Sequence, residues 1–212
     1  MKIKETITKA LSLGTGVAIG LILIAKVCYE MSHDTCYADY NQIYQIRTTY
    51  TQHGEDRDFP QISGAIAPGF KEHVPGVEVA TRWTFIFNSD KFIDEQKNVI
   101  NGECIVADTS FFDVFNTEIL SGDPKEAFTK IAVAMVSESF AEKLGGVSEA
   151  VGQVIYNEEM PNFKVEIGGV FKDFPHHSSI RNDVPISMAS LVASSTENWF
   201  GNDRYRGYVR LS

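Results

Sequence analysis

The stretch ALSLGTGVAIGLILIA, residues 10–25, decides the architecture of this chain. Its sixteen residues lie between Lys9 and Lys26 and carry no formal charge. Counted on to Tyr29, the apolar stretch reaches twenty residues with one lysine near its end. A helix rises about 1.5 Å per residue, and about 20 apolar residues cross the hydrocarbon of a bilayer. The stretch therefore predicts a membrane-spanning helix.

A cleaved secretory signal is the competing interpretation, because it also places lysines before an apolar core. A signal peptide needs small residues at a cleavage site after a core of about 7–15 residues. Here the core runs into Lys26, Val27 and Cys28, which fit neither such a site nor a lipoprotein processing site well. Lys26 is tolerated near a helix end, because its stem lies along the helix while the ammonium reaches the interface. These flanks favour a permanent anchor.

The charges on either side of the apolar stretch predict its orientation. Lys2, Lys4 and Lys9 precede the stretch, whereas Glu30 and Asp34 follow it. Lysine and arginine are enriched on the cytoplasmic side of membrane helices. We therefore expect a single span in the inner (plasma) membrane, with the N-terminus in the cytoplasm and the remainder of the chain outside.

One face of the predicted membrane helix carries small residues. Ser12, Gly16 and Gly20 recur at every fourth position, and the two glycines form a GxxxG pattern. Small side chains on one face allow a second helix to approach closely in lipid. Glycine is also common in membrane helices generally. We expect Ser12, Gly16 and Gly20 to be helix-packing candidates.

Length and charge divide the chain into two regions: a cytoplasmic tail with the helix over residues 1–32, and an extracytoplasmic domain, or two small lobes, over residues 33–212. The second region is long enough to bury a core. Residues 1–32 hold four lysines and two glutamates, a net charge of +2. Because the whole chain carries −9, residues 33–212 carry −11. This acidic balance disfavours nucleic acid and anionic membrane surfaces as partners.

The pattern after the helix is typical of an α+β domain, with many short strands, a few short helices and no alternation of strands with long helices. Asp108 and Ser137 stand where helix N-caps are expected, and Gly168-Gly169 inside a strand indicates a bulge or a close backbone approach. The chain ends at Ser212 within a strand pattern, which we expect of a piece of a longer protein. The expected strands cover 43–51, 77–87, 99–107, 131–136, 154–156, 163–171, 184–188 and 205–211, and the expected helices cover 63–73, 109–114 and 138–144.

The three cysteines do not form a recognisable framework. Cys28, Cys36 and Cys104 lack the CxxC spacing of a zinc site. A disulfide between Cys36 and Cys104 stays open as an alternative in an oxidising compartment, although the odd number of cysteines argues against a fold held together by disulfides.

Motifs of catalysis are absent from the sequence. His176 and His177 would point to opposite faces of a strand, so a solvated loop is the better interpretation. Glu103, Asp108 and Asp113 surround one short helix without any sign of a cleft. There is no GxSxG turn and no phosphate-binding GxxxxGK[ST] loop. We therefore assign no catalytic, cofactor-binding or metal-binding residue.

Several motifs, taken in order, resemble the MacB/FtsX-like ABC transporter permeases with a MacB-like periplasmic core domain, in the version found in Bacteroides-like bacteria. In that version a D-x-P-x-x-S pattern is echoed by Asp173, Pro175 and Ser178. The motifs are LGTGVAIG (13–20), EMSHD (30–34), NQIYQI (41–46), VPGVEVATR (74–82), ADTSFFDVF (107–115), LSGDP (120–124), VSESFAEKLG (136–145), VG (151–152) and GVFKDFP (169–175).

The resemblance implies a permease subunit with a first membrane helix, a periplasmic domain and three further helices. Such permeases are implied to work as a homodimer or a pair of permease chains, with a separate cytoplasmic ATPase as partner. Their outer domains are implied to move on ATP-driven closure, which is mechanotransmission in export or in lipoprotein or peptide handling. The matching residues Asp108, Phe112, Gly122, Asp123 and Pro124 are interpreted as structural.

Two other classes of protein remain as alternatives. The first is the extracytoplasmic sensor domain of a membrane receptor, in which a ligand outside signals inward. The second is an anchored enzyme, which the missing catalytic motifs disfavour. Three more apolar spans of about 20 residues after residue 212 would favour the permease.

Overall fold

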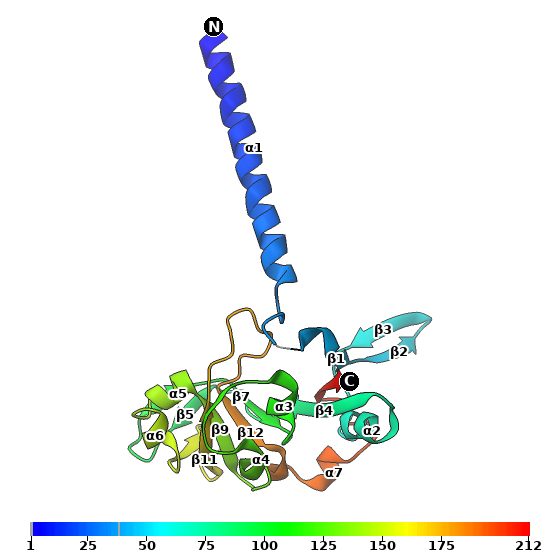
Figure 1. Cartoon of the computed structure of the whole chain (residues 1–212), viewed down its shortest axis with the longest axis vertical. Helices are drawn as coiled ribbons and strands as arrows, with labels where there is room; N and C mark the ends of the chain where they lie inside the picture. The colour runs from blue at the N-terminus through cyan, green and yellow to red at the C-terminus, as the bar shows by residue number, and fades with distance from the viewer. Residues whose placement is uncertain (1, 38) are drawn as a thin grey trace.

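The computed structural model of the chain describes residues 2–37 and 39–212, and it consists of a long helix standing on a folded domain (Figure 1). The helix α1 runs from Lys2 to Met31. Within it, Leu11–Met31 has a mean hydropathy of 2.0 over its most apolar part and is not buried against the domain. The predicted membrane-spanning helix is therefore present as one uninterrupted element.

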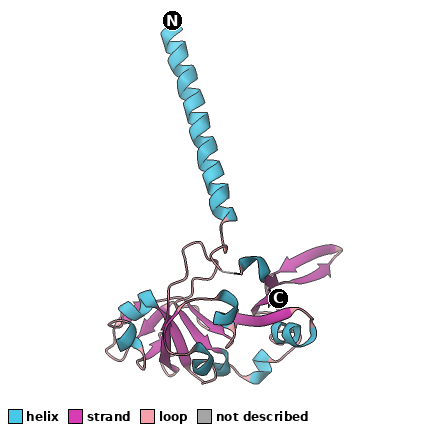
Figure 2. Ribbon diagram, in the orientation of Figure 1, coloured by secondary structure: helices cyan, strands magenta, loops and turns pink. Residues whose placement is uncertain are grey.

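The domain is built on one mixed sheet, which Figure 2 shows in magenta. β7 pairs in parallel with β12, and β9 pairs in parallel with β11, whereas the other pairs are antiparallel. β8 (Ile119–Ser121) also pairs with β11, but it lies outside the strand order given at the end of this paragraph. The sheet runs without interruption from β1 to β6. Its order is β1 (Ile43–Ile46), β13 (Arg206–Leu211), β4 (Val77–Thr84), β7 (Cys104–Ala107), β12 (Val184–Ser187), β9 (Val133–Ser137), β11 (Lys164–Phe171), β10 (Val154–Asn157), β5 (Lys91–Ile93) and β6 (Val99–Asn101).

The central strands are buried on both faces. In β7, Cys104 and Val106 pack into one hydrophobic cluster, whereas Ile105 and Ala107 pack into a second. Successive side chains of a strand point to opposite faces, so the two clusters lie on the two sides of the sheet. Strands that are covered on both sides read as apolar runs, which is why β7 and β9 lack a polar alternation.

Short helices cover these two faces. The face that holds Val106 is covered by α2 (Ile66–His73), α5 (Glu138–Glu142) and α6 (Val147–Ala150). The face that holds Ile105 is covered by α3 (Phe111–Phe115) and α4 (Pro124–Ala127). The remaining short helices are η1 (Tyr40–Gln42), η2 (Met188–Ser190) and α7 (Ala193–Thr196). The predicted α+β class is confirmed.

A separate hairpin projects from the domain beside β1 (Figure 1). It consists of β2 (Thr48–Gln52) and β3 (Glu55–Phe59), and the rings of Tyr50 and Phe59 stack with centroids 4.9 Å apart. The predicted single strand 43–51 is therefore wrong, because the chain leaves the main sheet at Arg47 and enters the hairpin.

The predicted strand 99–107 is also divided, at Gly102. The Gly102 amide donates to the Asp90 carbonyl oxygen (2.8 Å), outside the β7 ladder. A Cβ at Gly102 would lie 2.7 Å from Cδ2 of Phe140, so the backbone passes close to that ring. β6 therefore ends at Asn101, before this close approach, and β7 begins at Cys104, after it.

Two local predictions are confirmed. The Ser137 hydroxyl accepts a hydrogen bond from the Phe140 amide (3.3 Å) and caps α5. The register of β11 against β9 shifts between Ile167 and Gly169, which is the irregularity that the two glycines indicated.

The cysteines are free thiols. Cys104 is buried in the cluster on one face of the sheet, whereas Cys36 packs against the cluster on the other face. The sheet thus separates the two sulfur atoms, and the alternative of a Cys36–Cys104 disulfide is wrong.

The first and last strands of the main sheet are neighbours. β1 follows the exit from α1 and pairs antiparallel with β13, with Ile43 opposite Arg210 and Ile46 opposite Gly207. β13 in turn pairs with β4. The strand that receives the chain from the helix is therefore held at the edge of the sheet by the C-terminal strand.

Candidate functional site at the helix–domain junction

The junction begins directly after α1. The Ser32 amide still donates to the Cys28 carbonyl oxygen (3.1 Å), and Asp34 then adopts a left-handed backbone with φ of 62°. Aspartate is among the residues that tolerate this conformation. The chain therefore turns into the domain within three residues of Met31.

Asp34 is bound by a loop that is distant in sequence. Its Oδ1 accepts a hydrogen bond from the Ser179 amide (2.6 Å), and its Oδ2 accepts one from the Ser179 hydroxyl (2.7 Å). The Asp34 amide donates to the His177 carbonyl oxygen (2.9 Å). Hydrogen bonds to an ionised carboxylate are stronger than those between neutral groups. Three bonds thus hold the end of the helix against residues 177–179.

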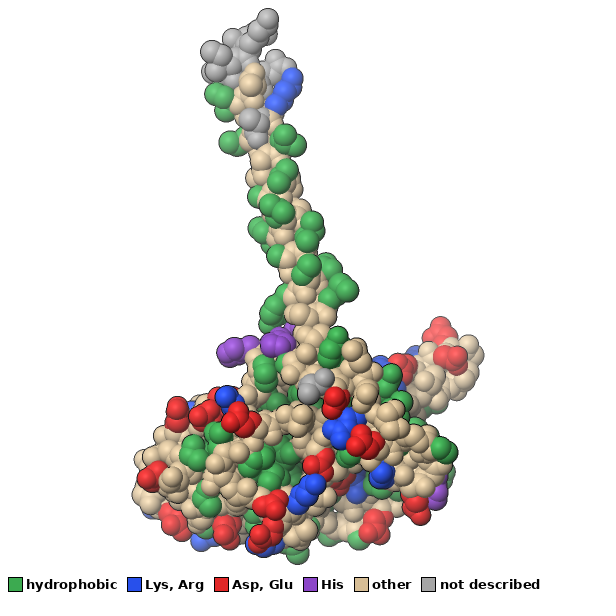
Figure 3. Space-filling view, viewed as in Figure 1, with side chains coloured by type: hydrophobic (Ala, Val, Ile, Leu, Met, Phe, Trp, Pro, Cys, Tyr) green, Lys and Arg blue, Asp and Glu red, His purple; other side chains and the backbone are tan. Residues whose placement is uncertain are grey.

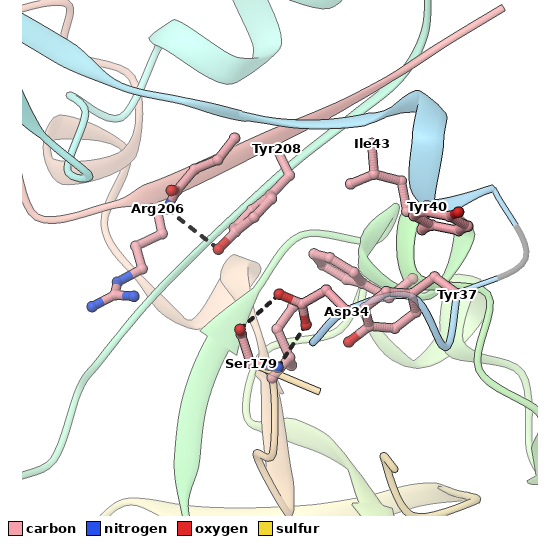
Figure 4. A pocket seen from close by; sticks show the side chains of 10 residues that line it. Asp34, Tyr37, Tyr40, Ile43, Ser179, Arg206 and Tyr208 are labelled. Carbon is pink, nitrogen blue, oxygen red and sulfur yellow. Dashed lines mark hydrogen bonds between the residues drawn. The ribbon is translucent and has the colours of Figure 1, made fainter. Parts of the chain in front are cut away.

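Tyr37 supplies a second attachment to the same loop. Its hydroxyl is hydrogen-bonded to the Ser178 hydroxyl, which also bonds the Ile180 carbonyl oxygen (2.7 Å). The Tyr37 ring packs against Phe115, with centroids 5.4 Å apart. Burial raises the pKa of Tyr37, so its phenol stays protonated at neutral pH. We call the contacts of Asp34 and Tyr37 with Ser178 and Ser179 the junction clamp. Figure 4 shows the two hydrogen bonds between Asp34 and Ser179.

The loop that receives the clamp, residues 172–183, connects β11 to β12 and reaches toward the base of α1 (Figure 1). The Lys172 amide donates to the Glu118 carbonyl oxygen (2.9 Å), and the Asp183 amide donates to the Glu103 carbonyl oxygen (2.9 Å). Within the loop, Arg181 Nε donates to the Ser178 carbonyl oxygen (3.1 Å). The loop is fixed at both ends and internally braced, and it leads into β12 at the centre of the sheet.

A pocket of about 290 Å³ lies between the clamp and β13 (Figure 4). Tyr208 lines it and accepts a hydrogen bond from Gln45 Nε2 (3.4 Å). Arg206 also lines it, and its guanidinium carbon lies 5.2 Å from the centroid of the Trp83 ring. These groups can donate and accept hydrogen bonds, but they do not pair a nucleophile with a base. Among residues 2–37 and 39–212, no group of three or more His, Cys, Asp or Glu side chains is placed to hold a metal ion.

A second polar centre joins two of the sequence motifs. Arg82 is 8% exposed, and its Nε lies 3.2 Å from Asp108 Oδ2. Its Nη1 donates to the carbonyl oxygens of Gly64 and Thr196. Burial raises the pKa of Asp108, and the guanidinium of Arg82 opposes that rise. The predicted role of Asp108 as a helix cap is wrong, because Ser110 occupies the N-cap of α3 and the Asp108 carboxylate faces Arg82.

The other motif residues are structural, as predicted. The Asp123 carboxylate caps α4 by accepting from the Lys125 amide (2.8 Å), and Pro124 follows it at the first helical position. Gly122 has φ of +81° and lies against the backbone of Gly168. Phe112 is buried in the core.

The remaining candidates from the sequence lie apart from the junction clamp or at its edge. Ser12, Gly16 and Gly20 lie on α1, and a Cβ added at either glycine would meet nothing within 4 Å. His176 and His177 lie in the loop 172–183, as expected. Of the clamp residues, two belong to motifs that the sequence had offered: Asp34 to EMSHD (30–34) and Ser178 to the D-x-P-x-x-S pattern. Tyr37 and Ser179 carry no motif that distinguishes them from ordinary turn and core residues.

An apolar helix clamped onto a mixed α/β domain defines a membrane-anchored domain protein. Residues 8–212 match the family model described as MacB-like periplasmic core domain. The chain belongs to this family of ABC transporter permeases, which favours the permease over the sensor-domain alternative. The permease-type family also indicates a non-enzymatic component.

Solved structures agree with this assignment. A domain of a protein assigned as a permease from Porphyromonas gingivalis is 35% identical, with a TM-score of 0.75 over 83% of this chain and 75% of that one. The periplasmic region of MacB from Actinobacillus actinomycetemcomitans is 12% identical, with a TM-score of 0.56 over 86% of this chain and 77% of that one. The extracellular domain of the noncanonical ABC-type transporter YknZ from Gram-positive bacteria is 17% identical, with a TM-score of 0.50 over 72% and 74% of the two chains. The last two likenesses concern the fold alone. The sequence has no match among curated proteins.

Proposed function

We propose that this permease chain transmits movement from the membrane to its periplasmic domain, and that the junction clamp is the element that transmits it. In this proposal a partner ATPase on the cytoplasmic side moves α1, and the domain follows. The observation that carries the proposal is the direct attachment of Asp34 to Ser179, three residues after the helix ends.

The path from the helix to the sheet is short and stiff. α1 is a continuous helix up to Met31, and the clamp binds its exit to the loop 172–183. This loop continues into β12, which lies between β7 and β9 in the middle of the sheet. Packed elements move as rigid bodies, because interiors are close-packed and do not deform continuously. A displacement of α1 is therefore expected to move the whole domain.

The remaining parts of the proposal concern topology and assembly. We place residues 1–32 as cytoplasmic tail and membrane helix, with the N-terminus in the cytoplasm, and residues 33–212 as the periplasmic domain. The lysines before the span support this orientation. A homodimer or a pair of permease chains would place two such domains side by side, and their movement would act on an exported molecule, a lipoprotein or a peptide.

The clamp is tested by measuring how rigidly the domain is held on α1. Spin labels at Ala25 on the helix and Val192 on the domain, with Cys28 and Cys36 replaced by serine, report the distance between the two parts in nanodiscs. We expect a narrow distance distribution in the wild type and a broad one in Asp34→Ala. Asp56→Ala is the matched control, because it removes a hydroxyl–carboxylate bond of similar length, Thr51 Oγ1 to Asp56 Oδ1 (2.6 Å), in the hairpin.

The functional arm uses the complete permease with its ATPase. Asp34→Ala should keep ATP hydrolysis while the ATP-dependent displacement of the domain label is lost, and Asp56→Ala should keep both. An equally narrow distribution in Asp34→Ala would show that the clamp does not hold the domain. Full ATP-dependent displacement in a variant with a broad distribution would overturn the transmission role.

A further inference from the structure

We propose that a hollow between the loop 172–183 and the start of α5 binds a neutral carbohydrate through the hydroxyl groups of a sugar ring. The hollow measures about 390 Å³, which lies within the range of about 300–1,000 Å³ that is usual for ligand pockets. This inference goes beyond the proposed movement of the domain and does not depend on it. We call the site the loop hollow, and the residues that line it include Ser139, Asp173, Phe174, Arg181, Asn182 and Asp183.

Asn182 is the residue that indicates a ligand. It is only 5% exposed, yet its carboxamide forms no hydrogen bond with any of residues 2–37 and 39–212. Among the same residues, the fully covered side-chain atoms that lack a partner belong to Thr81, Trp83 and Asn198, so the carboxamide atoms of Asn182 open into the hollow that this residue lines. Buried amides are normally hydrogen-bonded, because an unpaired one costs free energy. A bound molecule would complete this group.

The walls of the loop hollow are fixed before any ligand arrives. At one end of the loop, Asp173 Oδ1 accepts a hydrogen bond from the Ser139 amide (2.9 Å). At the other end, Asp183 Oδ1 accepts one from the Ser137 hydroxyl (2.9 Å). Both ends of the loop are thus tied to the first residues of α5. A site that is already ordered loses less conformational entropy when it binds a ligand.

The polar groups that remain available match hydroxyl groups. The carboxamide of Asn182 offers two donors and one acceptor oxygen. Asp173 Oδ2 accepts no hydrogen bond from the described residues, and the nearest bonding partner of the Ser139 hydroxyl is the Ser137 hydroxyl at 3.4 Å. A sugar hydroxyl both donates and accepts, so two neighbouring hydroxyls can satisfy both sides of the carboxamide and donate to the carboxylate.

Phe174 supplies an apolar wall. Its ring packs against Phe171, with centroids 5.4 Å apart, and it stays partly exposed where it lines the hollow. A sugar ring carries C–H groups on its faces and hydroxyl groups around its rim. An aromatic ring beside a set of polar groups therefore suits a molecule with one apolar face and a polar rim.

The charges around the hollow disfavour an anion. Asp173 and Asp183 line it against the single guanidinium of Arg181, which already donates to the carbonyl oxygens of Ser178 and His176. In Figure 3 acidic side chains are spread over the domain below the foot of α1. A phosphate or carboxylate would be repelled by this balance. An ammonium group only donates, so it would leave the donors of the Asn182 carboxamide unpaired.

The sheet also gives no support for a peptide bound as an added strand. The loop joins β11 to β12, and each of these strands has a neighbour on both sides, β9 and β10 for the first and β7 and β9 for the second. A peptide that binds as a strand needs an open strand edge. A compact, neutral, hydroxyl-bearing molecule is therefore the occupant that these observations favour.

The test is saturation-transfer NMR of the full chain in nanodiscs, with empty nanodiscs as the blank. The neutral probes are the methyl glycosides of glucose, galactose and mannose. Acetate, methylammonium and N-acetylglycinamide represent an anion, an ammonium ion and a peptide group. We expect at least one glycoside to receive saturation and the other three probes to receive none. A panel in which no glycoside binds would overturn the proposal, and so would one in which acetate, methylammonium or N-acetylglycinamide binds instead.

Asn182→Leu keeps the size of the side chain but removes its polar atoms, so the glycoside should bind at least about tenfold more weakly. Asp173→Asn changes the opposite wall at an exposed position, keeps an oxygen for the Ser139 amide, and should also weaken binding. The matched control is Asn157→Leu. Asn157 is 0% exposed but fully engaged, because its Nδ2 donates to the Ser89 carbonyl oxygen (2.8 Å) and its Oδ1 accepts from the Glu159 amide (3.0 Å). This control should keep glycoside binding.

Thermal unfolding separates a binding role of Asn182 from a structural one. Asn182→Leu should unfold at the same temperature as the wild type or higher, whereas Asn157→Leu should unfold at a lower temperature because it loses two hydrogen bonds. A lower unfolding temperature for Asn182→Leu would show that its carboxamide supports the fold, and this result would overturn the proposal. Undiminished glycoside binding in Asn182→Leu would do the same. Because binding is measured without ATP, these outcomes do not bear on the transmission of movement.

Discussion

Arg82 on β4 and Asp108, directly after the adjacent strand β7, stand opposite each other, with Nε and Oδ2 separated by 3.2 Å. The backbone supports the pair, because the Asp108 amide donates to the Arg82 carbonyl oxygen (3.2 Å) and the Arg82 amide donates to Asp108 Oδ2 (3.2 Å). The guanidinium also holds Gly64 and Thr196 through their carbonyl oxygens. One arginine thus joins β4, the segment before α2 and the end of α7.

Replacing Arg82 should destabilise the domain strongly. Arg82→Ala leaves a partly buried carboxylate and two carbonyl oxygens without their donor, and we expect the free energy of unfolding to fall by about 3 kcal/mol. Lys130→Ala is the control, because Lys130 and Glu126 form a solvent-exposed ion pair (2.8 Å), and exposed pairs contribute little to stability. Urea unfolding followed by tryptophan fluorescence measures both. Equal losses in the two variants would contradict the structural role of Arg82.

Gly169 should not accept a side chain. A Cβ there would press on the Ser121 carbonyl oxygen and lie 2.8 Å from Met135 Cε, so β8 and β11 would have to separate. We expect Gly169→Ala to cost about 2–3 kcal/mol of stability, as overpacking does. Gly54→Ala is the comparison, because φ is +82° there but no atom lies within 4 Å, so only the conformational cost of about 1 kcal/mol applies. A Gly169→Ala variant as stable as Gly54→Ala would show that β8 yields easily.

Stability at alkaline pH should depend on Tyr37. Burial raises the pKa of Tyr37 in the folded chain, whereas an unfolded tyrosine ionises near pH ~10. Above that pH the unfolded state loses the proton first, so it binds fewer protons than the folded state and the free energy of unfolding falls as the pH rises. Burial also raises the pKa of Tyr208, which adds to the effect.

Thermal unfolding between about pH 8 and 11 tests this expectation. Tyr37→Phe should start about 1 kcal/mol less stable, for the lost hydrogen bond to Ser178, but should lose stability less steeply with rising pH. Identical slopes for wild type and Tyr37→Phe would mean that the phenol is not protected in the folded chain.

The small-residue face of α1 remains a prediction about a partner helix. Leucine at Gly16 or Gly20 meets no atom of this chain near its Cβ, so the fold should be unaffected. If Ser12, Gly16 and Gly20 form a packing face, either substitution should weaken association of α1 in a membrane two-hybrid assay. Gly14→Leu, which also has open space at its Cβ but lies on a different face, is the control. Undiminished association in Gly16→Leu and Gly20→Leu would remove the interface.

Local signals were sufficient where a residue acts on its own neighbours. The uncharged run 10–25 predicts α1, and Ser137 predicts the start of α5, because each depends only on residues close in sequence. Strand positions followed from β-branched and aromatic runs. The breaks in these strands did not, since Gly102 follows the end of β6 beside the ring of Phe140, a residue of α5 that is distant in sequence.

Side-chain partners distant in sequence were not predictable. Asp108 has the position of a helix cap, and the alternative partner Arg82 lies 26 residues away in a different strand. The bond from Asp34 to Ser179 spans 145 residues. The residues next to Asp34 and Asp108 in sequence do not indicate whether each carboxylate binds a local or a distant partner, because that depends on how the sheet brings separate segments together.

The pairing of β1 with β13 determines how the domain would bear a pull. In an antiparallel pair the hydrogen bonds run perpendicular to the strands. A force applied at Ile43 along β1 therefore loads the hydrogen bonds of all four register pairs at once, in shear. β13 itself is paired with β4 on its other side. A force directed across the strand would instead peel these bonds apart one after another. The pairing of β1 with β13 therefore resists a force along the strand better than a force across it. The domain would follow a pull along β1, whereas a pull across β1 would detach this strand from the sheet.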